Sequence, residues 1–356
     1  MKKQEFTILS RLNLLINSCK DIENQSKKNF NSSSNIPSEA TLIEYQRLGR
    51  LLLQRAFTKN DGDLSKTIND TNSTRTFYKR IAAIRYFLVS YLKMIMSDFI
   101  SAKEISGSEK EKRVNEVIKH IEQLEHVIPQ FSKLIEVGFI GIRKRKESKR
   151  SALAGLPFDW RERICERAKY GKYINALRLS AITGLRPTEL KNGVDLWLDN
   201  DPSLECECLF ISILGAKVKE GQGQPRRLLI FKSATENKII QDLVDLVQHQ
   251  FNKSFRIQIE NTANFTCEIR RLAKDLWPTH KKAITAYCFR HQFSADIKKH
   301  RDAETVSAAL GHISSRSQKS YGLASQSRSS FLPNKIECVL KIHLKKITKN
   351  QLSLSD

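Results

Sequence analysis

Arg186 lies where one predicted helix ends and another begins, in the run Thr183-Gly184-Leu185-Arg186-Pro187-Thr188-Glu189-Leu190. Glycine suits the left-handed residue that ends a helix, and proline suits the first turn of the next one. Backbone N–H groups at such a junction favour an anion. A guanidinium beside them makes a two-pronged clamp for phosphate. In the alternative interpretation, Arg186 only stabilises the turn through Glu189.

A second arginine stands in the run Tyr287-Cys288-Phe289-Arg290-His291-Gln292-Phe293. Phe289, Phe293 and Ile297 are spaced four apart, which predicts a helix with these side chains in the core. Arg290 is one step off that stripe, so we expect it at the edge of the buried face. The alternative is an ordinary amphipathic helix with a surface arginine.

A histidine and a tyrosine follow, in Leu310-Gly311-His312 and, nine residues later, at Tyr321. Asp302 is typical of a helix N-cap, and Gly311 is typical of a helix end. The pattern therefore places His312 at a helix terminus, with Tyr321 after the short polar segment 314–320. A tyrosine beside a glycine is otherwise an ordinary half-buried aromatic residue.

In this order and at these spacings, the three runs resemble the catalytic domain of tyrosine recombinases, the phage integrase family. The family has a TGxRxxEL box, an HxxR box, an LGH box and then a tyrosine. Arg186 and Glu189 match the first box, and Arg290 matches the arginine of the second. Leu310, Gly311 and His312 match the third box, and Tyr321 stands at the position of the nucleophile. The resemblance covers residues 155–325 by motif.

The resemblance implies site-specific cleavage and rejoining of DNA through a covalent 3′-phosphotyrosine, as in integration, excision or resolution of a mobile element. Tyr321 would be the nucleophile, and Arg186 and Arg290 would hold the non-bridging oxygens. His312 would hydrogen-bond the phosphate or assist proton movement. The family also has a hairpin lysine that acts as general acid. Lys217 is favoured for this role over Lys219, and Glu189 would support the arginines.

The sequence departs from the family at Tyr287, where the HxxR box has histidine. A phenol can donate a hydrogen bond, but its pKa of about 10 makes it a poor base at neutral pH. His291 is next to Arg290, yet adjacent helix residues point about 100° apart. Direct substitution by His291 is therefore not expected, and Tyr287 is retained as a candidate site residue.

The pattern of elements predicts a mainly α fold with a small antiparallel sheet (α+β). Strands are expected near 204–213 and 227–231, joined by a flexible hairpin at 215–225, and a helix is expected over 172–183. We expect a helical core-DNA-binding domain over 1–142, a basic linker over 143–153 and a catalytic domain over 154–330. A C-terminal helix and tail over 331–356 would dock on a neighbouring protomer or pack on its own domain. By resemblance, the two domains would form a C-shaped clamp on DNA.

Lysine and arginine total 61 against 38 acidic residues, a formal net charge of +23. Such an excess predicts a polyanionic partner, because phosphate contacts release counterions. The predicted DNA-binding residues are on the linker and on a helix near 74–98, namely Arg143, Lys144, Arg145, Lys146, Lys149, Arg150, Arg75 and Lys79. The resemblance adds double-stranded DNA with a specific site, a homotetramer on paired sites and an accessory DNA-bending protein.

Neither a membrane-spanning run nor a signal-peptide core is expected from the sequence. The 7 cysteines are scattered and odd in number, which indicates reduced thiols with no metal site. We therefore expect a cytoplasmic, nucleoid-associated, bacterial protein that needs no cofactor.

Three other functions remain open from the sequence. A type IB topoisomerase shares the catalytic groups but relaxes supercoils as a monomer. A non-catalytic DNA-binding regulator would not need the tyrosine. An RNA-binding or ribosomal protein explains the charge but none of the boxes.

Overall fold

The computed structural model describes residues 2–29, 37–142, 148–216, 218, 223–328 and 332–343. The chain divides into two compact units, Met1–Lys146 and Glu147–Asp356. The division falls inside the segment 143–153 that was predicted as a linker. Each unit has its own hydrophobic core, and the two cores share no residue. The units are therefore described separately.

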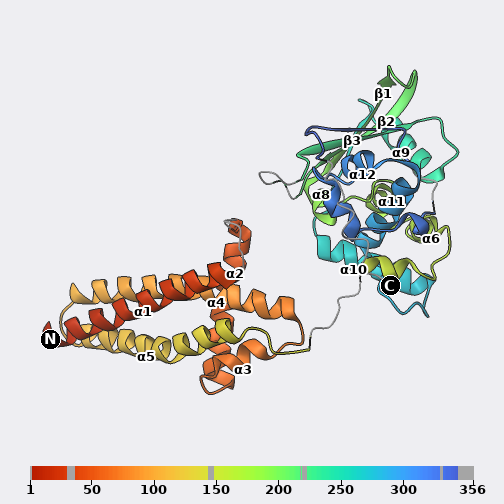
Figure 1. Ribbon diagram of the computed structural model, residues 1–356. Helices are drawn as coiled ribbons and strands as arrows, with labels where there is room; N and C mark the ends of the chain where they lie inside the picture. Colours follow the sequence, from red (N-terminus) through yellow and green to blue (C-terminus); the bar gives the residue numbers. More distant parts are fainter. Residues whose placement is uncertain are drawn as a thin grey trace. The chain divides into compact units, whose positions relative to one another are not determined.

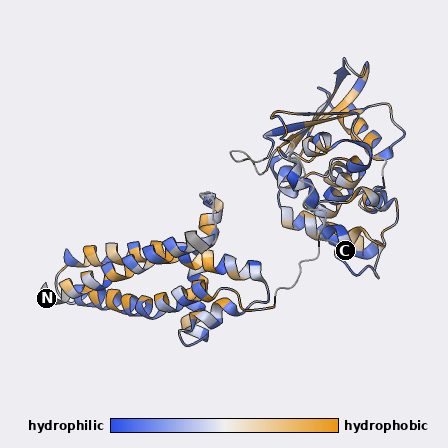
Figure 2. Ribbon diagram, in the orientation of Figure 1, coloured by the Kyte–Doolittle hydropathy of each residue, from blue (hydrophilic) through white to orange (hydrophobic). Residues whose placement is uncertain are grey.

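The N-terminal unit is helical, as predicted (Figure 1). Apolar and polar residues alternate around its long helices (Figure 2). The apolar stripes meet in a core that includes Leu12, Phe77, Ile84 and Phe131. The helices are α1 (Lys2–Asn29), α2 (Glu39–Lys59), α3 (Leu64–Asn69), α4 (Thr74–Lys103) and α5 (Ser108–Val137).

The short helix α3 was not predicted, because the segment 58–73 is mostly polar. Asp63 caps α3 by accepting a hydrogen bond from the Lys66 N–H, and Leu64 and Ile68 are fully buried. The helix is thus specified by one cap and two apolar residues.

The C-terminal unit combines short helices with one sheet. Helices α8, α11 and α12 lie beneath the sheet in Figure 1. The helices are α6 (Trp160–Arg167), α7 (Ile174–Thr183), α8 (Pro187–Asn192), α9 (Lys238–Gln248), α10 (Thr262–Leu276), α11 (Ala286–His300) and α12 (Ala303–Ala309). The 3-10 helices are η1 (Lys149–Leu153), η2 (Ser315–Ser320) and η3 (Ala324–Gln326).

The sheet among the described residues has five strands in the order β4-β1-β2-β3-β5, and all neighbouring strands are antiparallel. The fold class is therefore α+β, as predicted. The strands are β1 (Val194–Asp201), β2 (Cys206–Leu214), β3 (Arg226–Lys232), β4 (Ser254–Ile257) and β5 (Lys335–Cys338).

The predicted hairpin is confirmed, since β2 pairs with β3 from Cys208 opposite Lys232 to Leu214 opposite Arg226. Strand β1 was not predicted, although Val194, Leu196 and Leu198 are buried in alternation. That alternation is the signal for a half-buried strand.

The C-terminal helix that the sequence predicts within 331–356, at residues 334–347, is wrong where the structure describes this segment. Residues 335–338 form β5, which pairs with the edge of β3 and places Ile336 opposite Leu229. The apolar residues Ile336, Leu340 and Ile342 have a spacing that also fits a strand. Pairing decides the outcome, because β3 offers backbone groups that a helix would leave without partners. Residues 344–347 lie outside the described residues.

Candidate active site

The predicted turn around Arg186 is confirmed. Helix α7 ends at Gly184, which is left-handed at φ 56° and ψ 28°. Pro187 then opens α8, and Arg186 is its N-cap residue. Arg186 is buried, with 9% of the residue exposed. The turn therefore fixes the direction from which this guanidinium enters the site.

Glu189 holds two arginines from different elements. Its Oε1 accepts a hydrogen bond from Arg186 Nη1 at 2.6 Å, and its Oε2 accepts one from the Arg186 backbone N–H at 2.8 Å. The same carboxylate accepts bonds from Arg227 Nη1 and Nη2 at 3.2 and 2.9 Å. Burial alone would raise the pKa of Glu189, but the charge and hydrogen bonds of Arg227 hold it well below 4.5.

In the alternative interpretation, Arg186 only stabilises the turn by pairing with Glu189. This ion pair is present in the structure. The turn alone does not account for the whole cluster, since Arg227 on β3 also donates hydrogen bonds to Glu189. Arg227 was not predicted as a site residue. Its signal is alternation along β3, where Arg227, Leu229 and Phe231 are all buried.

Arg290 is completely buried, whereas we expected it at the edge of the buried face. Helix α11 is covered on every side over residues 288–297, so being one step off the stripe does not bring a side chain to the surface. Arg290 Nη1 donates to the Gly184 carbonyl at 3.1 Å. Its Nη2 donates to the Leu310 carbonyl at 2.5 Å. Arg290 thus joins the turn before α8 to the turn after α12.

His312 and Tyr321 lie against Arg290. Asp302 caps α12 through the Thr305 N–H, and Gly311 has a φ of 65°, so both predicted helix signals are confirmed. His312 Nε2 is 3.4 Å from Arg290 Nη2. The guanidinium carbon of Arg290 is 4.9 Å from the centre of the Tyr321 ring, and the ring centres of His312 and Tyr321 are 5.4 Å apart.

The arginines change the acid–base properties of both rings. Burial raises the pKa of Tyr321, but the charges of Arg290 and Arg186 outweigh it and bring the pKa below 10.0. Burial and the charge of Arg290 lower the pKa of His312 to about 3. At neutral pH, His312 is therefore an uncharged imidazole beside a phenol that ionises more readily than usual.

Tyr287 does not join this cluster. Its side chain is 41% exposed, and it makes no hydrogen bond or ring contact within the described part of the chain. His291 instead faces the tyrosine, with ring centres 5.5 Å apart. The angle of about 100° between neighbouring helix residues had argued against His291. The ring of Tyr321, however, is large enough to contact both Arg290 and His291.

The remaining candidates divide into described and undescribed residues. Lys149 and Arg75 are exposed, and Arg150 is partly buried. Lys79 is exposed and pairs with Glu44 at 2.6 Å. Outside the described residues lie Lys217, Lys219, Arg143, Lys144, Arg145 and Lys146.

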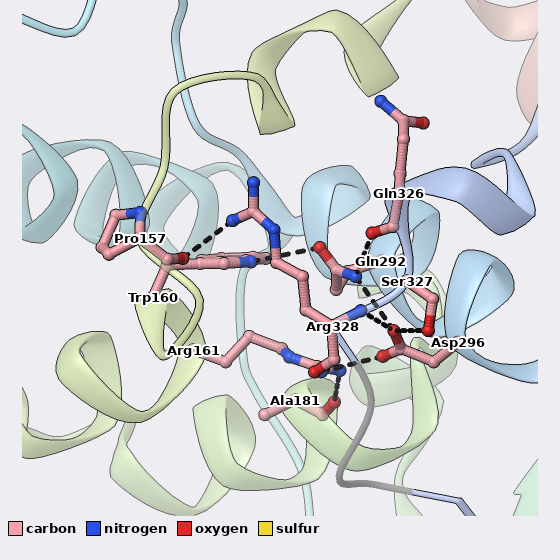
Figure 3. Close-up of polar contacts among 9 residues, drawn as sticks. All are labelled: Pro157, Trp160, Arg161, Ala181, Gln292, Asp296, Gln326, Ser327 and Arg328. Carbon is pink, nitrogen blue, oxygen red and sulfur yellow. Dashed lines mark hydrogen bonds and ion pairs between the residues drawn. The ribbon is translucent and has the colours of Figure 1, made fainter.

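A buried polar network holds the chain that follows Tyr321 (Figure 3). Arg161 Nη2 donates to Asp296 Oδ2 at 2.8 Å, and both side chains are at most 1% exposed. Asp296 Oδ1 accepts from the Arg328 backbone N–H at 2.7 Å and from Gln292 at 3.0 Å. Gln292 also donates to the Gln326 carbonyl at 2.9 Å. Helices α6 and α11 therefore fix the segment 326–328.

The described residues offer neither a metal-binding cluster nor a membrane-spanning helix. No group of three or more His, Cys, Asp or Glu side chains there could hold a metal ion. No helix there is both long and apolar enough to cross a membrane.

No protein-family model and no curated protein matches this chain. Among solved structures, XerA recombinase is 16% identical, with a TM-score of 0.33 over 85% of this chain and 93% of that one. XerH site-specific recombinase, bound to difH substrate, is 15% identical, with a TM-score of 0.33 over 81% and 95%.

The Tn1549 transposon integrase, in complex with a circular intermediate DNA, is 13% identical. Its TM-score is 0.36 over 85% of this chain and 95% of that one. These neighbours are recombinases and an integrase.

Proposed function

We propose that this chain is a tyrosine recombinase that cleaves and rejoins DNA at a specific site through a covalent 3′-phosphotyrosine. The observation that carries the proposal is the placement of Tyr321. Its ring lies 4.9 Å from the Arg290 guanidinium and 5.4 Å from the His312 ring, and the charge of Arg186 acts on its hydroxyl. A tyrosine that only filled space would not need two cations that favour its ionised form.

In the proposed reaction, the Tyr321 oxygen attacks the phosphorus atom of the scissile phosphodiester. The phosphorus–oxygen bond to the 5′ side breaks, and Lys217 donates a proton to that leaving oxygen, with Lys219 as the alternative donor. The phenol proton leaves to solvent as the bond forms, and His312, which is too weak a base to keep that proton, would hydrogen-bond the phosphate or assist the movement of the proton. The new phosphotyrosine bond retains the energy of the broken bond, so that rejoining needs no nucleotide cofactor.

The two arginines would neutralise the charge that builds on the non-bridging oxygens. Glu189 supports this role because it fixes Arg186 through two contacts, at 2.6 and 2.8 Å. A guanidinium that is held before the substrate arrives loses little freedom on binding. The arrangement therefore favours stabilisation of the transition state.

The proposed partner is double-stranded DNA, as the net charge of +23 suggests. Arg75, Lys79, Lys149 and Arg150, together with the basic run 143–146, would contact phosphates. Both units would then contribute to a clamp on the duplex. We further propose a homotetramer on paired sites, helped by a DNA-bending protein, that serves a mobile element. Specificity would come from base contacts and DNA shape.

A type IB topoisomerase activity is the nearest alternative, because it would use the same side chains. It predicts relaxation of any supercoiled plasmid by a monomer, without a target site. A non-catalytic regulator predicts DNA binding without a covalent product. The same cleavage experiment separates both alternatives from the proposal.

We expect Tyr321→Phe to abolish a covalent protein–DNA adduct while leaving DNA affinity within about twofold. The substrate is a duplex taken from the DNA that flanks the gene or selected for binding from a random library, and nicked near the cleavage point to trap the intermediate. The adduct is measured by denaturing electrophoresis and its tyrosine is located by mass spectrometry. Tyr170→Phe is the matched control, because Tyr170 is 94% exposed in the same unit.

Wild type that binds the duplex but never forms the adduct would show that the proposed chemistry is wrong. An adduct at a tyrosine other than Tyr321 would overturn the assignment of the nucleophile. Cleavage of arbitrary supercoiled DNA by a monomer would favour the topoisomerase.

A further inference from the structure

Lys298 contacts the chain on both sides of Tyr321. Its Nζ donates to the Gln318 carbonyl at 2.8 Å and to the Gly322 carbonyl at 2.8 Å. These carbonyls belong to the third residue before the tyrosine and to the residue after it. We propose that Lys298 is a positioning residue, whose ammonium bridges the two carbonyls and thereby holds the phenol in the site. The inference rests on the proposed function for its catalytic part.

The same carbonyl of Gln318 also accepts the backbone N–H of Tyr321, at 3.0 Å. Lys298 therefore adds a charged donor to the hydrogen bond that ends η2 at the tyrosine. Hydrogen bonds from a charged donor are roughly twice as strong as neutral ones. A short 3-10 helix such as η2 has poorer hydrogen-bond geometry than an α-helix. The donor that Lys298 adds at the Gln318 carbonyl therefore stabilises the end of η2.

Gly322 brings the segment directly onto α11. A Cβ atom at this position would lie 2.1 Å from the His291 carbonyl oxygen and 3.0 Å from Ala295 Cβ. His291, Ala295 and Lys298 are at i, i+4 and i+7, so they form one face of α11. This face both packs on Gly322 and supplies the ammonium that holds it.

Further along the chain, the segment is anchored by other residues of the same helix. Gln292 and Asp296 hold residues 326–328, as Figure 3 shows. That network does not touch the residues on either side of Tyr321. Lys298 contacts Gln318 and Gly322, so we expect its loss to affect the tyrosine between them more than the rest of the segment.

The test compares Lys298→Met with Lys299→Met. Both variants remove one positive charge from α11, but Lys299 is exposed. DNA affinity and the single-turnover cleavage rate at saturating DNA are measured on the nicked duplex. We expect similar affinities for the two variants and a cleavage rate about 10- to 100-fold lower for Lys298→Met, because small displacements of reacting groups cost rates of this order. Lys298→Arg should restore most of the rate, since a guanidinium can also donate to both carbonyls.

Hydrogen exchange provides a second readout that does not require activity. Peptides covering residues 318–323 should exchange faster in Lys298→Met than in Lys299→Met. Equal exchange would overturn the anchoring role. Equal cleavage rates, with wild type active, would overturn the positioning role.

If wild type forms no adduct, the proposed function fails, and hydrogen exchange still decides whether Lys298 anchors the segment. Thermal unfolding checks that the variants are folded. If Lys298→Met does not fold, Lys298→Gln is measured against Lys299→Gln with the same expectations.

Discussion

At the scale of single residues, the site is a buried cluster of arginines around the rings of His312 and Tyr321. Arg290 is 0% exposed and Arg227 is 1% exposed, while Glu189 is the carboxylate that pairs with Arg227 and Arg186. A further positive charge, on an imidazole beside three arginines, would be costly there. His312 therefore stays neutral, and its acid–base behaviour differs from that of a surface histidine.

We expect His312→Gln to flatten the dependence of stability on pH below neutrality. The pKa of His312 is lowered from 6.5 to about 3 in the folded chain. Between these values the unfolded chain binds a proton that the folded chain does not, so wild type loses stability as the pH falls from 6.5 toward 3. One such proton contributes at most about 1.4 kcal/mol per pH unit.

The measurement is urea unfolding followed by tryptophan fluorescence at pH 7, 6, 5 and 4. It reports on the C-terminal unit, because Trp160, Trp197 and Trp277 all belong to it. His300→Gln, at an exposed position of α11, is the control and should keep the wild-type slope. Identical slopes for His312→Gln and wild type would contradict a neutral, buried His312.

At the scale of elements, the ends of α7 and α12 matter more than the helices themselves. Each helix ends in a glycine with positive φ, and each terminal turn offers a carbonyl to Arg290, at 3.1 Å for Gly184 and 2.5 Å for Leu310. The Arg290 guanidinium is therefore held by backbone carbonyls whose positions depend on the conformation of the C-terminal turns of α7 and α12.

We expect Gly184→Ala to destabilise the C-terminal unit by roughly 2–5 kcal/mol, from a left-handed backbone and overpacking together. At φ 56°, an added Cβ would lie 2.6 Å from Phe293 Cβ. Gly155→Ala is the matched control, because Gly155 has a φ of 78° with no atom within 4 Å of the added Cβ. Gly155→Ala should lower the free energy of unfolding only by the cost of the left-handed backbone conformation, about 1–2 kcal/mol. Urea unfolding measures both, and equal losses would mean that the contact with Phe293 is relieved.

At the scale of the whole molecule, the chain consists of two units with separate cores. In the described residues, the first has five helices, and the second combines helices with a sheet. Every residue that forms the candidate catalytic cluster belongs to the second unit. The proposed cleavage chemistry therefore belongs to the second unit, whereas many of the proposed DNA contacts belong to the first.

We expect fragments 1–146 and 147–356 to fold independently, because neither core draws residues from the other unit. Each fragment should unfold cooperatively in urea, and full-length protein should show the sum of the two transitions. Circular dichroism follows both units, and tryptophan fluorescence follows the second. An unfolded 147–356 fragment would show that the second unit depends on the first.

Much of the local structure around the site was predictable. Gly184, Pro187, Asp302 and Gly311 act through their own backbone conformations or through a bond to a residue three positions away. Such signals depend only on residues that are close together in the chain, so they can be recognised from the sequence directly. The hairpin between β2 and β3 was predicted for the same reason, from two apolar runs around a glycine-rich tip.

The sequence by itself thus determined the order of the site residues, the turns that present them and the α+β class. Only the tertiary structure decided that Arg290 is fully buried, that Arg227 shares Glu189 with Arg186, that His291 rather than Tyr287 faces Tyr321, and that residues 335–338 form a strand. These outcomes depend on elements far apart in the chain that pack against one another. The spacing of residues within one segment cannot predict such packing, because each contact is made with a residue of another, distant segment.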